Sequence, residues 1–419
     1  MKDDWVALLD CNNFFVSCER LFRPELKNKP VIVLSSNDGC VVARSQEVKD
    51  MGVPMGVPYF KIKDIIKDKG ITTFSSHLAL YRDISRRVFS VMRNNLNLVE
   101  QYSIDEAFFR ISGESLEEVN WVKYEVERSV GIPVSVGVAK TKTLAKLANT
   151  YAKKGSGIYR LDNDEDWLEI SKNIPLAKIW GVGGGLEMRY KNHSILTVFD
   201  LLSADRDRVS KLFGVGGVRL KDELSGVRVF PLGSVKEPQK TILSSRSFKK
   251  ETKSIDVLAD SVAYHVRHAV ADLRSMQMKA RGVRVSIHPS RYGDFVLKGG
   301  SKEVVLNSPT NDSIEIMKLA QRILKDLFED GVPYKKAGIT LSLFSPDSVE
   351  QPNLFDKPSD SENNSKLMGI IDSLNSKSSK ELVVLGGRFK EKSWRPRLEE
   401  RSPAYTTNWN DIATVSAKT

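Results

Sequence analysis

Three carboxylates lie where short apolar strands end, and they are the residues of this sequence best suited to metal chemistry. Asp10 follows the apolar run at residues 5–9. Asp105 and Glu106 lie within residues 103–108, a segment whose pattern predicts a strand, a hairpin corner and a second strand. Because an uncompensated charge pair is costly there, we expect a cation beside it. Carboxylate oxygens suit magnesium, which completes its coordination with water and phosphate oxygens.

The elements that must position these carboxylates alternate along the chain. Short apolar strands are predicted at residues 31–34 and 134–138, and helices at 14–22, 78–92 and 116–130. This alternation predicts an α/β layer with helices packed on a sheet. An insertion at residues 39–76 carries small elements and Gly-Val-Pro turns of its own. A compact α/β domain with an inserted module is therefore expected up to about residue 170.

Glycine-rich turns mark the region that follows. Gly181 and Gly183 lie between two predicted helices, and Gly214 and Gly216 repeat the Gly-Val-Gly pattern. Glycines let backbone N–H groups approach a phosphate closely, and helix N-termini add partial positive charge. The pattern predicts helix-hairpin-helix elements that hold a nucleic-acid backbone, whereas the alternative is an ordinary glycine at the end of a helix.

A second α/β domain is predicted after a proline-containing tether. Strands are expected at residues 282–287, 295–297, 304–306 and 337–343, and helices at 257–273 and 313–327. Between residues 240 and 344 there are 18 basic and 11 acidic residues, so most of the net charge of +11 lies here. A polyanion is the expected partner. Four arginines are candidate contacts to DNA phosphates, with a solvated basic face as the alternative: Arg246, Arg281, Arg284 and Arg291.

Length and composition exclude several classes of protein. A chain of 419 residues is long enough for three or four domains. Cys11, Cys18 and Cys40 lack the spacing of a zinc site and are odd in number, which favours a reducing cytoplasm. No window approaches the ~18 apolar residues of a membrane span.

From residue 345 the chain becomes polar and is expected to be partly flexible, with one short amphipathic helix at 367–374.

Two segments of the sequence resemble the catalytic motifs of the Y-family lesion-bypass DNA polymerases. Residues 10–19 (DCNNFFVSCE) resemble the first motif, and residues 103–108 (SIDEAF) resemble the second. Residues 36–44 and 139–149 are most similar to the UmuC-type branch, and the likeness continues to residues 405–407. This resemblance covers nearly the whole chain and favours a metal site over an acidic turn.

The resemblance implies a polymerase right hand and a translesion activity. The fold class is α/β and α+β multidomain: palm (1–38 and 77–170), fingers (39–76), helix-hairpin-helix thumb (171–229), linker (230–240), little finger (241–344) and tail (345–419). The implied activity is template-directed DNA synthesis past damaged bases, of low fidelity, in DNA repair and damage-induced mutagenesis. Two Mg²⁺ ions are implied. Asp10 and Asp105 bridge both, Glu106 binds the catalytic ion, and the Cys11 carbonyl supplies a further oxygen.

The resemblance also assigns the residues around the incoming nucleotide. Lys153 matches the lysine that binds the triphosphate. The broader family often has Tyr and Arg in the fingers, where this chain has Gln46 and Lys49. Lys49 keeps the positive charge of the usual arginine but cannot form its paired hydrogen bonds to phosphate. Either Arg44 compensates for that loss or it is an ordinary surface cation.

Two adjacent phenylalanines complete the implied nucleotide site. Phe15 is the steric gate against a ribose 2′-hydroxyl, with core packing as its alternative, and Phe14 is its neighbour toward the core.

The tail contains a segment that resembles the peptide by which bacterial polymerases bind the sliding clamp. Gln351, Leu354 and Phe355 match that pattern, whereas Pro352 replaces the usual Leu. An incidental apolar pair in a linker is the alternative. Proteins of the UmuC type commonly work with a small accessory dimer of the UmuD type and a recombinase filament, but no segment here identifies a site for either.

Two other functions have to be weighed against polymerase activity. Nucleotide cyclases also use a palm with paired metal carboxylates, but they need neither a hairpin thumb nor a basic domain. A non-catalytic DNA-binding or recruitment protein would have no use for Asp10, Asp105 and Glu106 together. Primer extension on damaged and undamaged templates separates all three.

Overall fold

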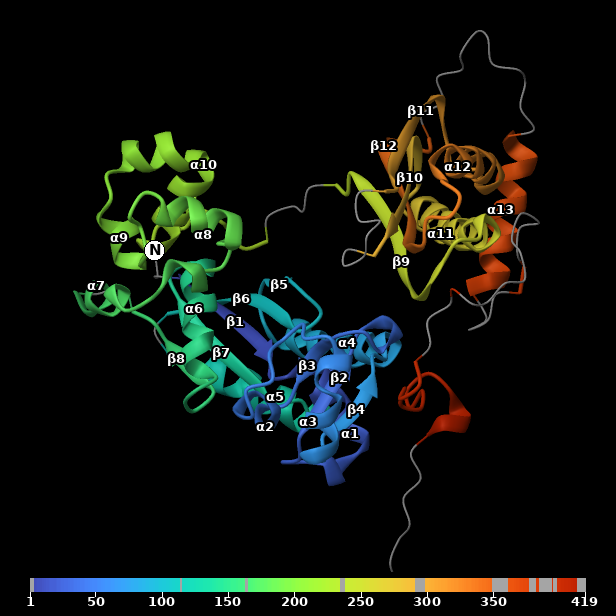
Figure 1. Ribbon diagram of the computed structural model, residues 1–419. Helices are drawn as coiled ribbons and strands as arrows, with labels where there is room; N and C mark the ends of the chain where they lie inside the picture. Colours follow the sequence, from blue (N-terminus) through green and yellow to red (C-terminus); the bar gives the residue numbers. More distant parts are fainter. Residues whose placement is uncertain are drawn as a thin grey trace, which may run out of the picture. The chain divides into compact units, whose positions relative to one another are not determined.

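The computed structural model describes residues 4–113, 115–162, 165–233, 238–290, 298–348, 361–376, 382–383, 394 and 398–412. The chain forms two compact units (Figure 1). The first unit comprises Met1–Val235 together with Leu398–Thr419, and the second comprises Lys236–Arg397. The chain therefore leaves the first unit, builds the second and returns to the first.

A mixed five-stranded sheet with the order β5-β6-β1-β7-β8 is the centre of the first unit. Its strands are β1 (Asp4–Cys11), β5 (Val99–Gln101), β6 (Glu106–Ser112), β7 (Val134–Ala139) and β8 (Ile158–Arg160). The central β1 pairs antiparallel with β6 and β7, and β8 is parallel to β7 (Figure 1).

Both faces of β1 are buried, which explains its continuous apolar run. Alternate residues, such as Ala7 and Leu9, pack on one face against α1 (Phe14–Phe22), α4 (Leu78–Asn95) and α5 (Glu117–Val130). Val6 and Leu8 pack on the other face with α6 (Lys142–Ala152). Asp10 continues the second series, because strand side chains alternate.

Gly137 allows α6 to lie directly on β7. A Cβ atom at this position would lie 2.2 Å from the backbone nitrogen of Asn149. The Asn149 side chain donates to the carbonyl oxygens of Leu8 and Ser135, which attaches α6 to two neighbouring strands. The close packing fixes the residues of α6 relative to the end of β1.

A smaller sheet with the order β3-β2-β4 follows α1 in the chain. Its elements are η1 (Pro24–Leu26), β2 (Val31–Leu34), η2 (Ser36–Asp38), β3 (Val41–Arg44), α2 (Gln46–Asp50), η3 (Tyr59–Lys61), α3 (Lys63–Asp68) and β4 (Thr72–Ser75). β2 pairs with β3 and β4, so the predicted boundary after residue 38 separates β2 from its own sheet. Strand pairing, which the turn signals at Gly39 do not reveal, moves that boundary toward the N-terminus.

Helices make up the rest of the first unit before residue 235. They are α7 (Glu165–Lys172), η4 (Leu176–Lys178), α8 (Gly184–Lys191), α9 (Val198–Ser203) and α10 (Arg206–Leu224). Gly181 has φ 89° and precedes α8, for which Gly183 is the N-cap. Gly214 has φ 65° and divides α10 into two helical pieces. The first predicted hairpin thus begins with one short 3₁₀ turn and not with a full helix.

The second unit is a four-stranded antiparallel sheet, ordered β11-β10-β12-β9, with helices packed on one face. Its elements are β9 (Thr241–Thr252), α11 (Ile255–Ser275), β10 (Met278–Pro289), β11 (Gly300–Thr310), α12 (Ser313–Leu327), β12 (Tyr334–Pro346) and α13 (Ser361–Ser376). The predicted strand at residues 295–297 lies outside the described residues. β9, at the sheet edge, was not predicted because its sequence is mostly polar.

The C-terminal region divides between the two units. Arg274 of α11 pairs with Asp372 of α13 at 2.7 Å, and Trp394 is buried with its indole N–H donating to Asp260. Residues 398–412 instead pack on the first unit and end in η5 (Trp409–Asp411). The tail, predicted to be partly flexible, therefore contains a packed segment far along the chain.

Two further predictions concern thiols and membranes. Cys11, Cys18 and Cys40 are free, and the first two are buried. Among the residues that the structure describes, no helix is both long enough and apolar enough to cross a membrane.

Candidate active site

β1 and the β5–β6 hairpin bring the three predicted carboxylates together. Asp10 lies opposite Glu106 in the register of β1 and β6. The backbone N–H of Cys11 donates to the carbonyl oxygen of Asp105 at 2.9 Å, which holds the hairpin corner against the end of β1. The Cys11 side chain is buried in the core, as expected for a residue that contributes only its backbone.

Ser103 shapes the hairpin corner that carries Asp105 and Glu106. Its Oγ donates to Asp105 Oδ1 at 2.6 Å and accepts from the backbone N–H groups of Asp105 and Glu106 at 3.2 and 3.0 Å. A side chain that bonds to the backbone two and three residues later stabilises a tight turn. The two adjacent carboxylates are thus held in place by local bonds.

Two lysines of α6 and its C-cap reach the carboxylates. Lys146 Nζ lies 2.8 Å from Glu106 Oε2, and Lys153 Nζ lies 2.7 Å from Asp10 Oδ2. The Lys146 ammonium also lies 4.8 Å from the ring centre of Tyr102 and 5.8 Å from that of Trp180. Lys146 is therefore confined between rings, whereas the Lys153 side chain is 40% exposed and freer to move.

The environment of Asp10 fits a divalent cation. The pKa of Asp10 is raised to about 7, because burial and, to a smaller extent, the charges of Glu106 and Asp105 outweigh the opposing effect of the Lys153 ammonium. Among the described residues, no group of three or more His, Cys, Asp or Glu is arranged to hold one metal ion, and lysines pair with two of the carboxylates. A buried carboxylate beside two others is nevertheless the donor set that hard cations bind.

Three cations gather next to the carboxylates. Lys49 Nζ donates to Asn13 Oδ1 at 2.6 Å. Burial lowers the pKa of Lys49, the positive charges of Lys153 and Arg44 lower it further, and Asp10 raises it. The Arg44 Nε is buried and has no hydrogen-bond partner within the described part of the chain. A guanidinium whose Nε has no partner, beside two lysines, is suited to bind an anion with several oxygens.

Phe15 and Phe14 have different surroundings although they are neighbours in α1. Phe14 is buried in the core, with 4% exposed. Phe15 is half-buried, and its ring stacks on that of Tyr81 in α4 with 4.4 Å between centroids and 16° between planes. Phe15 is therefore less buried than Phe14, and its role as steric gate stays a prediction.

The predicted DNA-binding arginines do not share one face of the second unit. Arg284 is exposed on the open face of the sheet and pairs with Glu303. Arg281 is exposed at the β-bulge of β10, where its Nε donates to the Leu306 carbonyl oxygen. Arg246 lies on the helix face, 5.6 Å from the ring centre of Tyr264.

The prediction for Arg246 is thereby corrected. Arg246 is paired in register with Ala337, a core residue, so its side chain points to α11 and away from the open face. Arg291 and the clamp-like residues Gln351, Leu354 and Phe355 lie outside the described residues.

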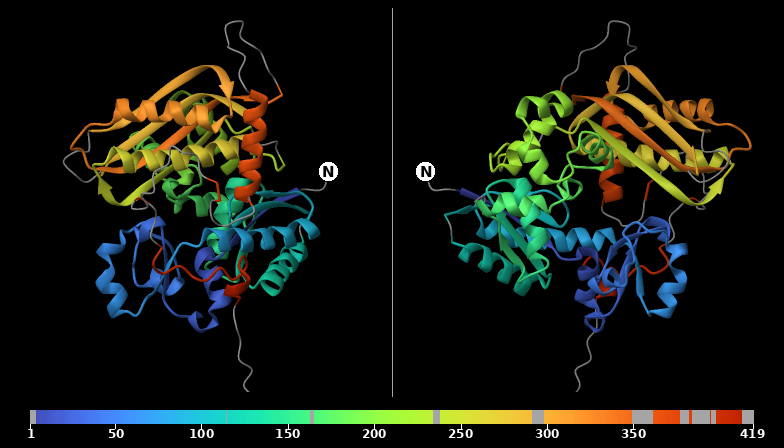
Figure 2. Two further views of the ribbon diagram at one scale, coloured as in Figure 1. Left: turned by 90° about the vertical axis from the view of Figure 1, so that its right-hand side faces the viewer. Right: turned by 60° about the vertical axis from the view of Figure 1, so that its left-hand side comes forward.

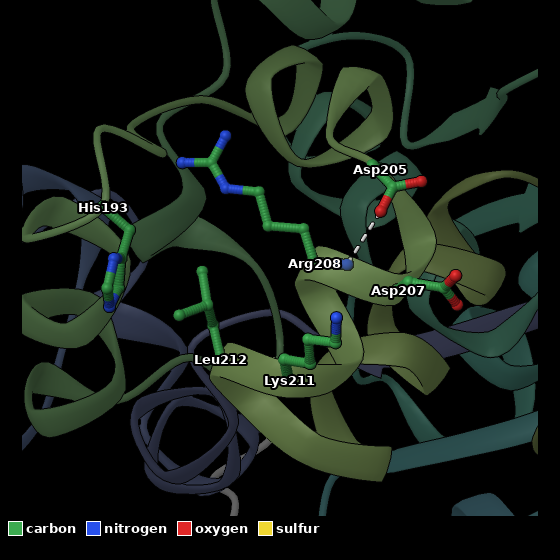
Figure 3. A pocket seen from close by; sticks show the side chains of 6 residues that line it. All are labelled: His193, Asp205, Asp207, Arg208, Lys211 and Leu212. Carbon is green, nitrogen blue, oxygen red and sulfur yellow. Dashed lines mark hydrogen bonds between the residues drawn. The ribbon is translucent and has the colours of Figure 1, made fainter.

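Surface hollows lie away from the carboxylates. One of about 400 Å³ is formed where α8 ends and α10 begins (Figure 3). Its lining residues are His193, Asp205, Asp207, Arg208, Lys211 and Leu212. Asp205 caps α10 by accepting from the Arg208 backbone N–H at 2.8 Å, so at least this residue has a structural role. A second hollow of about 360 Å³ is lined by Asn95, Glu117, Glu118 and Trp121.

Lys146 was missed as a site residue, although one signal in the sequence could have identified it. Lys146 and Lys153 are seven residues apart, two turns of a helix, and so lie on one face of α6 and its cap. Tyr81 was also missed, and nothing local in the sequence marks it as the partner of Phe15.

The chain is similar to known proteins along most of its length. Residues 9–150 match the model of the impB/mucB/samB family, residues 239–354 match the C-terminal domain of that family, and residues 365–415 match a domain of unknown function (DUF4113). The chain is 35% identical to Protein UmuC of Salmonella typhimurium over 98% of this chain and 99% of the relative. It is 29% identical to a DNA polymerase IV of Desulfatibacillum aliphaticivorans, over 89% and 94% of the two chains.

A solved structure has the same fold. It is a Y-family DNA polymerase chimera of Dbh and Dpo4, which superimposes with a TM-score of 0.65 at 20% sequence identity. The match covers 81% of this chain and 98% of the chimera.

Proposed function

Because this chain belongs to the impB/mucB/samB family, the UmuC-type branch of the Y-family DNA polymerases, we propose that its carboxylates and cations form the site of nucleotidyl transfer. The protein is a template-directed DNA polymerase of translesion synthesis, and its substrates are primer-template DNA and deoxynucleoside triphosphates. The observation that carries the site is the position of Asp10, Asp105 and Glu106 beside Arg44, Lys49 and Lys153.

Enzymes of this kind need a divalent metal, and we propose two Mg²⁺ ions. Asp10 and Asp105 would hold both, Glu106 would bind the catalytic ion, and the carbonyl of Cys11 would add an oxygen. Bound there, the metal would lower the pKa of the primer 3′-hydroxyl and neutralise charge on the leaving pyrophosphate. Lys146 orients Glu106, since both carboxylate oxygens of Glu106 accept from its ammonium at 2.9 and 2.8 Å.

Lys153 is proposed to exchange one partner for another when the nucleotide binds. Lys153 pairs with Asp10 in the free enzyme, and its half-exposed side chain turns to the triphosphate when the nucleotide binds. Arg44 and Lys49 meet the same phosphates from the side of β3 and α2. The charge on the nucleotide is thus balanced by groups from two separate parts of the first unit, the β3–α2 segment and the C-terminal end of α6.

Primer extension tests the function directly. We expect the purified chain to copy an undamaged template with Mg²⁺ and to insert a nucleotide opposite a template lesion and continue. A nucleotide cyclase would form product without a template, and a recruitment protein would form none. Failure to extend any primer on either template would contradict the proposed function.

The raised pKa of Asp10 predicts a pH-dependent requirement for magnesium. Protonated Asp10 cannot hold a cation, so the apparent affinity falls as the pH drops below about 7. The Mg²⁺ concentration for half-maximal extension should be about tenfold higher at pH 6 than at pH 8, given the two ionised fractions. Titrations of Mg²⁺ at both pH values check this, with the rate at saturating Mg²⁺ as the control. An equal requirement at both values would contradict it.

The remaining DNA contacts are proposals of the same kind. The backbone around Gly181, Gly183, Gly214 and Gly216 holds DNA phosphates, because glycine allows close approach. Arg281 and Arg284 contact phosphates from the exposed side of the second unit. Arg284 must first release Glu303, to which it is paired at 2.5 Å.

We further propose that Gln351, Leu354 and Phe355 bind the sliding clamp. Deleting residues 351–355 should leave extension of short primers unchanged and remove the stimulation given by added clamp, because docking raises the effective concentration of enzyme at the primer end. Extension on a long primed circle, with and without clamp, measures the effect. A deleted enzyme that still responds fully to clamp would place the contact elsewhere.

Two partners and a compartment complete the proposal. A UmuD-type accessory dimer and a recombinase filament are proposed from the family alone. The cytoplasm is proposed as the compartment because the DNA substrate is there.

A further inference from the structure

The segment at residues 398–412, red in Figure 2, belongs to the first unit and contacts α1, the helix that carries the proposed steric gate, through Ser402 and Tyr405. It belongs to the matched domain of unknown function. The family assignment gives it no role in nucleotide transfer. Its side-chain contacts nevertheless connect this segment to Phe15, through Glu19 and Tyr81.

One face of α1 collects these contacts. Phe15, Glu19 and Phe22 are separated by four and then three residues, so they follow one another along the same side of the helix. Phe15 stacks on Tyr81, and Phe22 stacks on Tyr405 with 4.4 Å between centroids and 8° between planes. The same helix face is thus covered by α4 at one end and by the C-terminal segment at the other.

Glu19 joins the two ends through a buried hydrogen-bond network. Its Oε1 accepts from the Tyr81 hydroxyl at 2.6 Å and from the Ser402 hydroxyl at 3.2 Å. Ser402 Oγ is also 3.1 Å from His77 Nδ1. Glu19 and Tyr81 are fully buried, and Ser402 is only 7% exposed. The ring that lies behind Phe15 is therefore fixed by a carboxylate that the C-terminal segment helps to hold.

Within the described residues, the side-chain donors to Glu19 are neutral hydroxyls, and the charge of Arg23 is the smallest of the influences on its pKa. Burial raises the pKa of Glu19 and lowers that of His77 to about 4, so the imidazole is neutral near pH 7. The second carboxylate oxygen, Oε2, has no hydrogen-bond partner within the described residues. Each neutral donor to Oε1 therefore matters, because buried polar atoms without partners are costly.

The backbone of the segment is anchored beside the network. The Ser75 N–H donates to the Glu400 carbonyl oxygen, and the Glu400 N–H donates to Ser75 Oγ, both at 3.0 Å. Ser75 is the last residue of β4, at the edge of the small sheet, where Arg401 forms a parallel bridge with it. Ser402 is thus placed at Glu19 by backbone bonds on its N-terminal side and by the Tyr405 stack on its C-terminal side.

We propose that residues 398–412 form a clasp that fixes Tyr81 behind Phe15 and so tightens the discrimination against ribonucleotides. This rests on the proposed role of Phe15 as steric gate. Ser402, Glu19 and Tyr81 are positioning residues, because they act through Phe15 and touch no substrate. A loosened Tyr81 lets the Phe15 ring tilt away from the position of a 2′-hydroxyl.

The test compares full-length variants for their selectivity between sugars. Ser402→Ala removes the hydroxyl that donates to Glu19, and Tyr405→Ala removes the stack on Phe22. Thr407→Ala is the matched control, since Thr407 is an exposed residue of the same segment. The measurement is kcat/KM for a deoxynucleotide and for the matching ribonucleotide, on one primer-template.

We expect the ratio of the two kcat/KM values to fall about fivefold in Ser402→Ala, the effect of losing roughly one hydrogen bond, and by a similar factor in Tyr405→Ala, which loses an aromatic stack of comparable strength. The ratio should be unchanged in Thr407→Ala. Tyr81→Phe, which removes only the hydroxyl, should act like Ser402→Ala. In the double variant that combines Ser402→Ala with Tyr81→Phe, the selectivity ratio should fall by less than the product of the two single effects, because both substitutions act through Glu19.

A merely structural role predicts a different result. General loosening would lower both kcat/KM values together and leave their ratio unchanged, which would overturn the clasp. Phe15→Ala serves as the reference. If Phe15→Ala relaxes selectivity and Ser402→Ala does not, the proposed role of the clasp is wrong, whereas the proposed role of Phe15 as steric gate is supported. If Phe15→Ala leaves selectivity unchanged while Ser402→Ala relaxes it, the gate is wrong and the clasp acts on another residue of the pocket.

Discussion

Asp105→Asn should lower the rate of primer extension at least about a thousandfold, which corresponds to about 4 kcal/mol of transition-state stabilisation. The variant keeps an oxygen that can accept from Ser103 Oγ, so the hairpin corner should retain its shape. What it loses is the negative charge on which the two metal ions depend. The effect should therefore fall on chemistry and not on folding.

Binding of primer-template DNA is the control measurement for this variant. The proposed DNA contacts lie on the thumb and the second unit, so Asp105→Asn should bind a labelled primer-template nearly as well as the parent chain. Asp83→Asn, in α4, is a matched charge change at an ion pair with the exposed Arg87 and should extend normally. Substantial extension by Asp105→Asn at saturating Mg²⁺ would refute the assignment.

The second large effect is expected from Phe15→Ala, which should relax the choice of sugar. Removing the ring leaves room for a 2′-hydroxyl and touches no proposed metal ligand. Discrimination against ribonucleotides should fall on the order of a hundredfold, or about 2.7 kcal/mol, with a much smaller loss for deoxynucleotides. Parallel measurements of kcat/KM for both sugars give the ratio.

Phe14→Leu separates this effect from a disturbed helix. Phe14 is the buried neighbour in α1, so its replacement perturbs the core of the same helix without opening the proposed gate. Its selectivity ratio should match that of the parent chain. If Phe15→Ala excludes ribonucleotides as strongly as before, Phe15 is a packing residue and another side chain is the gate.

The sequence was sufficient where local periodicity is strong. The helices at residues 14–22 and 313–327 and the strand at 31–34 have the bounds predicted from their apolar patterns. The carboxylate cluster was also predictable, because strand ends and a hairpin corner are local features. The α/β multidomain fold is confirmed by its likeness to a solved Y-family polymerase.

Features that depend on distant contacts were not predictable. The edge strand β9 is polar along most of its length, so it lacked the alternation that signals a strand. The side of the sheet to which Arg246 points follows from its register with Ala337, which lies far along the chain. The docking of Ser402 at Glu19 joins residues 383 positions apart, and no local pattern encodes it.

The path of the chain has a consequence for protein engineering. Because Leu398–Thr419 belongs to the first unit, Lys236–Arg397 is topologically a domain inserted into a host, with one junction near residue 235 and another near residue 397. Exchanging this domain with that of a related polymerase therefore requires two crossover points. A graft made at the first junction alone would also replace the final segment of the host, and would then combine α1 of one protein with the terminal residues of another.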